Sequence, residues 1–305
     1  MDFGKLENVD NVRFSMPIDD ADNARILNKF PTHKIPTIRI GCTGWSVREW
    51  SGSIYPQKIA TSDFPKFYGK QFSTIEFNTT HYRTPEISDC ERWHDAMPSD
   101  FRFAPKMLQQ VSHAENLNSV IDLAKRFYYN LSFLKDKLGP IFIQFPPTFS
   151  PKSLNVLENF LKHTPEYIRL AVEVRHPTWF HEKNFNALKQ LLENYKCSFV
   201  ISDVSGRRDI LHSSLTQSYV LIRFVGNSLH PTDYQRVDWW CKRIKEWLIL
   251  GLEEIYFFSH QPENIKSPIM AEYFYEKMKS ILNFPVEMRG QIFLETPKND
   301  QLSLF

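Results

Sequence analysis

Charged and amide side chains follow short apolar runs at several separate places in this chain. Glu76 and Asn78 close one such run, and Glu173 and Arg175 close another. Because successive side chains of a β-strand point to opposite faces, the two members of each pair share a face. A carboxyl group near apolar walls can shift toward neutrality and act as a general acid or base, and arginine can bind phosphate or carboxylate bidentately. These residues therefore predict acid–base chemistry on an anionic ligand.

Other polar and aromatic residues stand at or after the ends of the remaining runs. Lys106, Arg175 and Arg223 would hold the anion, and three aromatic rings could stack on a ring of the ligand. The predicted catalytic residues are Glu76, Glu173, His176 and Asp203, and the predicted substrate-binding residues are Trp45, Asn78, Tyr82, Lys106, His113, Gln144, Arg175, Trp179, Arg223 and His260. A structural alternative stays open, in which the same charges neutralise one another as a buried network.

A bound divalent metal ion is a further open alternative, and the cofactor stays unassigned. The residues with suitable ligand types are Glu76, Glu173, His176, Asp203 and His260. None of them shows a tight ligand spacing such as HExxH, but barrel enzymes also gather ligands from separate strands. No GxSxG elbow occurs, and no cysteine stands beside a histidine that could activate it, so nucleophilic catalysis by serine or cysteine has little support.

Eight β-rich runs alternate with segments of helical period between residues 37 and 283. Such alternation implies parallel strands joined by helices, and eight units match a (β/α)8 TIM barrel, an α/β fold with its chemistry at the carboxyl ends of the strands. A doubly wound sheet is the alternative, but its usual glycine-rich phosphate loop is missing after the first run. Residues 1–36 read as an N-terminal extension and residues 284–305 as a flexible C-terminal tail. The runs span 38–42, 74–78, 102–105, 140–145, 169–174, 198–202, 219–224 and 254–259, and the helical segments lie near 61–70, 88–96, 117–137, 151–162, 183–194, 232–250 and 268–281.

Composition narrows the class of protein. The chain has 305 residues, 42% of them hydrophobic, and a formal net charge of +2, so it shows no global signal of polyanion binding. No run of about 18 apolar residues predicts a membrane span, and the N-terminus lacks the pattern of a signal peptide. The four cysteines are far apart in the sequence and form no CxxC pair. We therefore expect a cytoplasmic protein with reduced thiols and no membrane contact.

Six segments also carry a family resemblance. They are GCTGWSVREW (41–50), IEFNTTHYRTP (75–85), FRFAPK (101–106), LGPIFIQFPPTF (138–149), RLAVEVRHPTWF (169–180) and YVLIRFVGN (219–227). With these the chain resembles the YecE-like family, known as domain of unknown function 72, over about residues 38–283. The resemblance implies a TIM barrel related in shape to the endonuclease IV and xylose isomerase group, and it implies no established reaction.

The chain departs from that family pattern at two strand ends. After Arg223 it reads Phe224-Val225-Gly226, where the family usually has His-Gly. The last strand ends Phe258-Ser259-His260, where the family usually has a pair of asparagines. The departure puts an amide contact at the last strand end in doubt, although His260 could replace it.

The last five residues are Gln301-Leu302-Ser303-Leu304-Phe305, and they follow a polar, turn-rich stretch. Large apolar side chains at a free chain end are costly to leave in water, so they either fold back onto the domain or bind a groove on a partner. The pentapeptide resembles the peptide by which many bacterial repair and replication proteins dock on the DNA polymerase sliding clamp. In such peptides the glutamine is a hydrogen-bonding anchor, and the leucines and phenylalanine fill apolar pockets.

These expectations favour a DNA-associated, repair-type enzyme, a phosphodiester or nucleotide-directed hydrolase, that the sliding clamp recruits. The near-neutral net charge fits recruitment better than strong intrinsic DNA affinity, because each phosphate contact needs a lysine or arginine. Two alternatives stay open. One is an enzyme that acts on a sugar phosphate or another small anion, with the tail packed on the barrel. The other is a non-catalytic module that binds an anion or nucleic acid.

Overall fold

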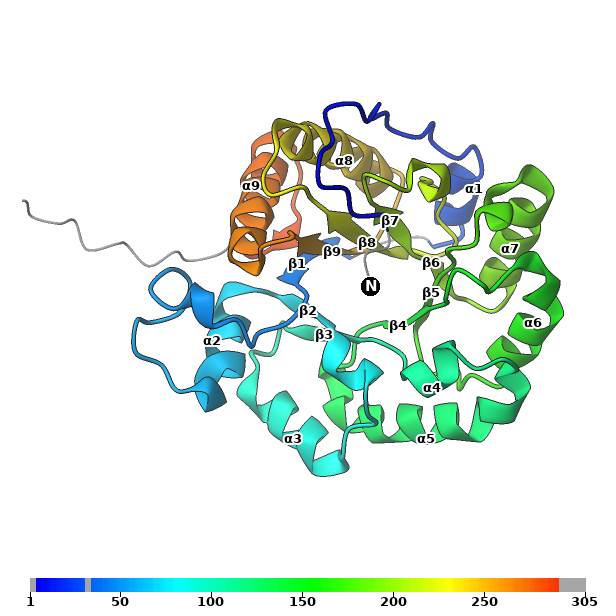
Figure 1. Cartoon of the computed structure of the whole chain (residues 1–305), viewed down its shortest axis with the longest axis horizontal. Coiled ribbons are helices and arrows are strands. Elements are labelled where there is room, and N and C mark those ends of the chain that lie inside the picture. Colours follow the sequence, from blue (N-terminus) through cyan, green and yellow to red (C-terminus); the bar gives the residue numbers. More distant parts are fainter. Residues whose placement is uncertain (1–3, 31–33, 291–305) are drawn as a thin grey trace, which may run out of the picture.

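Short strands alternate with helices along the chain (Figure 1). The computed structural model describes residues 4–30 and 34–290. Each of the seven predicted helical segments contains an α-helix, so the predicted α/β alternation is confirmed. The strands are β1 (Thr37–Cys42), β2 (Thr74–Phe77), β3 (Arg102–Pro105), β4 (Ile141–Gln144), β5 (Leu170–Glu173), β6 (Ser198–Phe199), β7 (Ile201–Asp203), β8 (Tyr219–Val225), β9 (Glu254–His260) and β10 (Glu287–Met288). The α-helices are α1 (Asn23–Leu27), α2 (Phe64–Gln71), α3 (Ile87–Ala96), α4 (Gln109–Ser112), α5 (Ile121–Leu131), α6 (Leu154–Lys162), α7 (Glu182–Asn194), α8 (Pro231–Ile249) and α9 (Ser267–Ile281).

The strand pairings in the described residues are parallel and form three sheets. Their orders are β10-β1-β9-β8-β7, β2-β3 and β4-β5-β6. In Figure 1 the strands stand around a common centre, and the longer helices lie outside them. Parallel neighbours place their carboxyl ends on one side, so residues that end different strands meet there.

The sheets that contain β1 and β2 meet through a buried tyrosine of α2. The Tyr68 hydroxyl accepts a hydrogen bond from the Cys42 N–H at 2.8 Å and donates one to the Thr74 carbonyl at 2.9 Å. Gly41 makes this approach sterically feasible, because a Cβ there would lie 2.1 Å from the Thr74 carbonyl oxygen. A similar junction joins β3 to β4, where the Met107 N–H donates to the Phe142 carbonyl at 2.8 Å.

The predicted run 198–202 is two strands rather than one. Strand β6 pairs with β5, β7 pairs with β8, and Val200 between them donates its N–H to the Val172 carbonyl at 3.0 Å. The chain therefore passes from one sheet to the next inside a single apolar run, which hydrophobicity does not reveal.

Apolar side chains fill both sides of the strands. The buried residues of α5 recur at one-turn spacing and pack on the outer side of the strands, as an amphipathic helix requires. A separate, smaller cluster lies on the inner side, and its members alternate with outward-facing residues. That inner cluster comprises Ala104, Phe142, Ala171, Val200, Tyr219, Leu221, Tyr256 and Phe258.

The predicted N-terminal extension packs on the domain. Asn23 of α1 donates to the Ser213 carbonyl and accepts from the Leu215 N–H, both at 2.7 Å. Asp20 forms an ion pair with Lys189 at 2.6 Å. These contacts anchor α1 and the residues before it to the loop that precedes β8 and to α7.

Part of the predicted C-terminal tail also belongs to the folded domain. Strand β10 pairs with β1 through Thr37–Glu287 and Ile38–Met288. The expected start of the tail at residue 284 therefore precedes a strand of the sheet. The predicted partner-binding residues Gln301, Leu302, Leu304 and Phe305 lie outside the described residues. Among the helices of the described ranges, none combines the length and the apolarity that a membrane crossing needs.

Candidate active site

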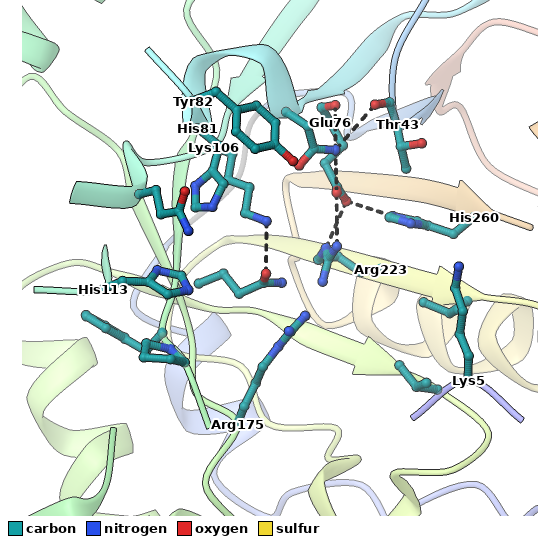
Figure 2. Close-up of a pocket in the computed structure, with 17 residues that line it drawn as sticks. Lys5, Thr43, Glu76, His81, Tyr82, Lys106, His113, Arg175, Arg223 and His260 are labelled. Atoms are coloured by element: carbon teal, nitrogen blue, oxygen red, sulfur yellow. Dashed lines mark hydrogen bonds and ion pairs between the residues drawn. The ribbon is translucent and has the colours of Figure 1, made fainter. Parts of the chain in front are cut away.

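A pocket of about 380 Å³ opens at the carboxyl ends of the strands (Figure 2). Nine of the fourteen predicted catalytic and substrate-binding residues line it. They are Glu76, Asn78, Tyr82, Lys106, His113, Gln144, Arg175, Arg223 and His260. Glu173 lies directly beneath, hydrogen-bonded to three of these side chains. The structure thus brings together ten of the fourteen residues, and their roles stay predictions.

Strand alternation explains why these side chains converge. Five residues of the inner apolar cluster stand two positions before a polar residue on the same strand or directly after it, so both point inward. The pairs are Ala104 and Lys106, Phe142 and Gln144, Ala171 and Glu173, Leu221 and Arg223, and Phe258 and His260. The apolar members form the base, and the polar members lie above it at the strand ends.

Arg223 joins the two predicted catalytic glutamates. Its Nε and Nη2 donate to the two carboxylate oxygens of Glu76 at 2.8 and 3.0 Å, and its Nη1 donates to Glu173 at 2.9 Å. Arg175 donates from Nε to the other oxygen of Glu173 at 2.8 Å. The planar guanidinium suits such paired contacts. The floor of the pocket is therefore a buried network of charges that neutralise one another, as in the structural alternative of the sequence analysis.

Both glutamates are ionised at neutral pH, which differs from the expected shift toward neutrality. Burial alone would raise the pKa of Glu173, but Arg223 and Arg175 outweigh it and lower the pKa to about 2. For Glu76, burial is again the opposing influence, and Arg223 with His260 holds its pKa well below the usual range. The glutamates therefore act as fixed counter-charges, and their ionised state does not suit a general acid.

His260 ends β9 on top of Glu76. Its Nε2 lies 2.8 Å from the Glu76 Oε2, and because the carboxylate accepts, Nε2 carries the proton. Burial lowers the pKa of His260 despite the nearby carboxylates. Asn78 donates to the other oxygen of Glu76 at 3.1 Å. The sequence predicts that His260 replaces an amide side chain at this strand end, and the structure has the neutral imidazole of His260 there.

Lys106 has a different environment from the two arginines. Its Nζ donates to the Gln144 Oε1 at 2.9 Å, and Gln144 is oriented by its own hydrogen bond from Nε2 to Glu173 at 2.8 Å. Lys106 therefore contacts the neutral amide of Gln144, while the carboxylates of the pocket are hydrogen-bonded to arginines. Burial, followed by repulsion from Arg223, lowers the pKa of Lys106 to about 8.

Two further histidines line the pocket on the Lys106 side. His81, in the 3-10 helix Asn78–His81, lies with Nδ1 2.7 Å from the Met107 carbonyl. Because a carbonyl only accepts, Nδ1 carries the proton and Nε2 keeps a lone pair. Burial lowers the pKa of His81 to about 4, and burial with the charges of Lys106 and Arg175 lowers that of His113. Both rings are therefore neutral bases at pH 7.

Asp203, predicted as catalytic, lies on the outer face of β7. Val200 and Val204 occupy inward positions, and the alternation directs the Asp203 carboxylate away from the pocket toward α8. There it accepts from Arg236 at 2.9 Å and from the Trp240 Nε1 at 2.7 Å, and it also pairs with Arg208. The structure therefore removes Asp203 from the pocket and gives it a structural role.

Three other predicted site residues also lie outside the pocket lining. His176 accepts from the Thr178 N–H and hydroxyl and so caps the 3-10 helix Pro177–Phe180. Trp179 is fully buried and donates its indole N–H to the Phe149 carbonyl at 2.7 Å. Trp45 packs on Phe77 with ring centroids 4.8 Å apart. Of the three aromatics predicted to stack on a ligand, Tyr82 lines the pocket, and it is 77% exposed.

The residues predicted as metal ligands are divided between two places. Asp203 and His176 lie outside the pocket lining, and the Glu76 and Glu173 carboxylates contact Arg223. Within residues 4–30 and 34–290, no group of three His, Cys, Asp or Glu side chains is arranged to hold a metal ion. These residues do not fit a metal site.

Several lining residues were missed in the sequence. Thr43 and Val204 continue the inward alternation directly past their strands, and Val225 is the last inward residue of β8, so the same periodicity could have found them. His81 stands in the segment Thr80-His81-Tyr82 after β2, and the sequence there only weakly indicates that it lines the pocket. Lys5 also lines the pocket, and nothing in its local sequence indicates this.

Sequence comparisons with known proteins match most of this chain. A sequence model of the family described as "Protein of unknown function DUF72" matches residues 39–289. The UPF0759 protein YecE of Escherichia coli strain K12 is 26% identical over 266 residues, which cover 80% of this chain and 94% of that protein. The UPF0759 protein YunF of Bacillus subtilis strain 168 is 29% identical over 150 residues, or 47% of this chain and 52% of that protein.

Solved structures give the same assignment of fold. A DUF72 family protein of Enterococcus faecalis V583 superposes with a TM-score of 0.67 at 18% identity, covering 84% of this chain and 100% of that one. A DUF72 family protein of Thermotoga maritima MSB8 superposes with a TM-score of 0.63 at 24% identity, covering 80% and 99%. At these identities the likeness shows the fold alone.

Proposed function

The chain belongs to the DUF72 family, and we propose that it is an enzyme whose Lys106 amine reacts with a small carbonyl compound that bears a phosphate or carboxylate. We further propose that the three sheets together form one closed (β/α)8 barrel, with the pocket at its carboxyl-end mouth. This is the small-anion alternative of the sequence analysis, with Lys106 reassigned from binding the anion to reacting with the ligand.

The hydrogen bond between Lys106 and a neutral amide carries this proposal. A lysine paired with a carboxylate is held in its charged form, whereas Gln144 stabilises the ammonium far less. With a pKa of about 8, roughly a tenth of the side chain is the free amine at pH 7. Desolvation and neighbouring cations are the usual means of activating a lysine nucleophile.

The chemistry needs the residues that line the pocket and no further group. The amine would attack the carbonyl carbon to give a carbinolamine, and loss of water would then give an imine. The amine proton moves to the carbonyl oxygen in the first step, and in the second step the nitrogen loses its remaining proton as the hydroxyl leaves as water. His81, with its unprotonated Nε2, lines the same pocket and can relay these protons. The lining cations Lys5, Lys106, Arg175 and Arg223 outnumber the ionised Glu76 and Glu173, which favours an anionic partner.

Reductive trapping tests this function. The full chain is incubated at pH 8 with cyanoborohydride and pyruvate, glyoxylate or glycolaldehyde phosphate, with acetone as the uncharged comparison. We expect one reduced adduct per chain, located at Lys106 by peptide mass spectrometry, and less adduct with acetone. Labelling spread over exposed lysines such as Lys152 and Lys242, with none enriched at Lys106, would refute the proposal.

The C-terminal pentapeptide favours a second candidate function. We propose that residues 301–305 dock the protein on a bacterial sliding clamp in the cytoplasm and so bring a DNA-associated hydrolase to DNA. Its support is the sequence match alone, since these residues lie outside the described structure. The substrate of the pocket would then be a nucleotide or a phosphodiester, whose charge the same lining cations suit.

Clamp binding by the full chain and by a chain without residues 301–305 tests this second candidate. We expect a Kd of about 1 μM for the full chain and no measurable binding after truncation, because apolar anchors in pockets dominate such contacts. Leu302→Ala and Phe305→Ala should behave like the truncation, and Ser303→Ala is the matched control. Equal binding with and without the pentapeptide would refute docking through this segment.

A further inference from the structure

Residues 4–14, here called the N-terminal strap, lie across the loop that follows β7. The Gly206 N–H donates to the Gly4 carbonyl at 2.8 Å. Gly4 has a φ of +73°, and a Cβ there would lie 2.6 Å from the Arg207 Cγ, while a Cβ at Gly206 would lie 2.7 Å from the Gly4 oxygen. Two glycines therefore allow the strap to approach the loop this closely.

Further contacts fix the course of the strap beyond Gly4. Val9 is buried, and Asp10 lies 3.7 Å from the Nε2 of His230, the residue that caps α8. The Phe14 ring lies 4.9 Å from the Arg236 guanidinium and 5.2 Å from that of Arg208. In Figure 1 the dark blue segment runs accordingly from the end of β7 to the outer side of α8.

Lys5 extends from the strap into the pocket. It is one of the lining residues, and Figure 2 shows its side chain on the side of His260, away from His113. No hydrogen bond or ion pair to the Lys5 ammonium occurs in the described ranges 4–30 and 34–290. An exposed cation at a binding pocket without a protein partner is available to a ligand.

The charges beneath Lys5 cancel. Arg175 and Arg223 match Glu76 and Glu173, two cations against two carboxylates, and the hydrogen bonds between them are short. When Lys106 is the free amine, the net positive charge of the pocket therefore comes from Lys5. When Lys106 is uncharged and able to react, the site therefore depends on Lys5 of the strap to attract an anion.

We infer that the N-terminal strap completes the site, with the Lys5 ammonium binding the phosphate or carboxylate group of the ligand. This inference rests on the proposed small-anion function. The family match begins at residue 39, so the strap lies outside the matched region. Lys5 is therefore a specificity-determining residue of this chain that the family core does not supply.

Binding of two plain anions to the full chain tests the inference. Isothermal titration at pH 8.5 uses inorganic phosphate and acetate, with wild type, Lys5→Met, Lys5→Arg and Lys242→Met. Lys242 is exposed on α8, so its replacement removes the same charge away from the pocket. We expect Lys5→Met to weaken binding about tenfold, Lys5→Arg to restore most of it, and Lys242→Met to change it less than twofold. A larger loss for phosphate than for acetate would identify the preferred group.

The possible failures are distinguishable. Binding to wild type that Lys5→Met leaves unchanged would overturn the role of the strap, while the anion pocket would stand. Equal weakening by Lys242→Met and Lys5→Met would also overturn it, because the effect would then be overall charge. Failure of wild type to bind either anion would overturn the proposed function and the inference together.

Discussion

Replacing Arg223 by methionine will lower the free energy of unfolding by about 3–5 kcal/mol at pH 7. The substitution leaves the buried carboxylates of Glu76 and Glu173 without the guanidinium that contacts both. Methionine fills similar space, so the loss reports the unpaired charges rather than a cavity. Urea denaturation of the full chain measures it, with the exposed Arg126 changed to Met as the matched control.

The pH dependence of this loss gives a second check. In the wild type the pKa of each glutamate is depressed in the folded state, so the stability they contribute is present above about pH 4.5 and is lost as pH falls toward 2. In the variant a buried carboxylate without a counter-charge takes up a proton more readily. The difference between the two proteins should therefore shrink as pH falls from 7 to 4. A difference under about 1 kcal/mol at pH 7, or one that grows on acidification, would contradict the assigned network.

Lys106→Arg will abolish the trapped adduct as completely as Lys106→Met, with at least a 100-fold loss of adduct formation for both. Arginine keeps the positive charge but does not lose its proton in proteins. The pair of variants therefore separates an amine that reacts from a cation that binds. Adduct yield at pH 8 is the readout, with Lys152→Met as the control and with phosphate binding measured in parallel.

Three outcomes of that comparison have distinct meanings. Loss of the adduct in both variants, with anion binding kept in Lys106→Arg, supports a reactive amine. Unchanged adduct yield in either variant would contradict it. No adduct in the wild type, combined with anion binding that Lys106→Arg preserves and Lys106→Met weakens, would favour the non-catalytic module of the sequence analysis.

Strand alternation and helical period predicted most of the fold and much of the pocket. Glu76, Lys106, Gln144 and Arg223 could be placed together because each follows an apolar run at a strand end, and parallel strands bring those ends together. The same rule failed for Asp203. The apolar run before it does not show which of its residues face inward, and the structure has Val200 and Val204 inward and Asp203 outward.

Protonation states and long-range contacts could not be predicted in this way. Whether the glutamates are neutral or ionised depends on where the Arg223 guanidinium points, and Arg223 lies 147 residues along the chain from Glu76. Lys5 reaches the pocket because Gly4 and Gly206, which are 202 residues apart in the sequence, let the strap cross a loop. Neither relation leaves a local pattern in the sequence.

The pKa of Lys106 in the free, full-length protein tests the central claim most directly. Competitive labelling with trace acetic anhydride between pH 6.5 and 11, read by peptide mass spectrometry, gives the titration of each lysine separately. We predict that Lys106 titrates with a pKa of about 8, well below the ordinary lysine value of about 10.4. Titration of Lys106 together with the exposed lysines would contradict the proposal that its amine is activated by burial and a neutral partner.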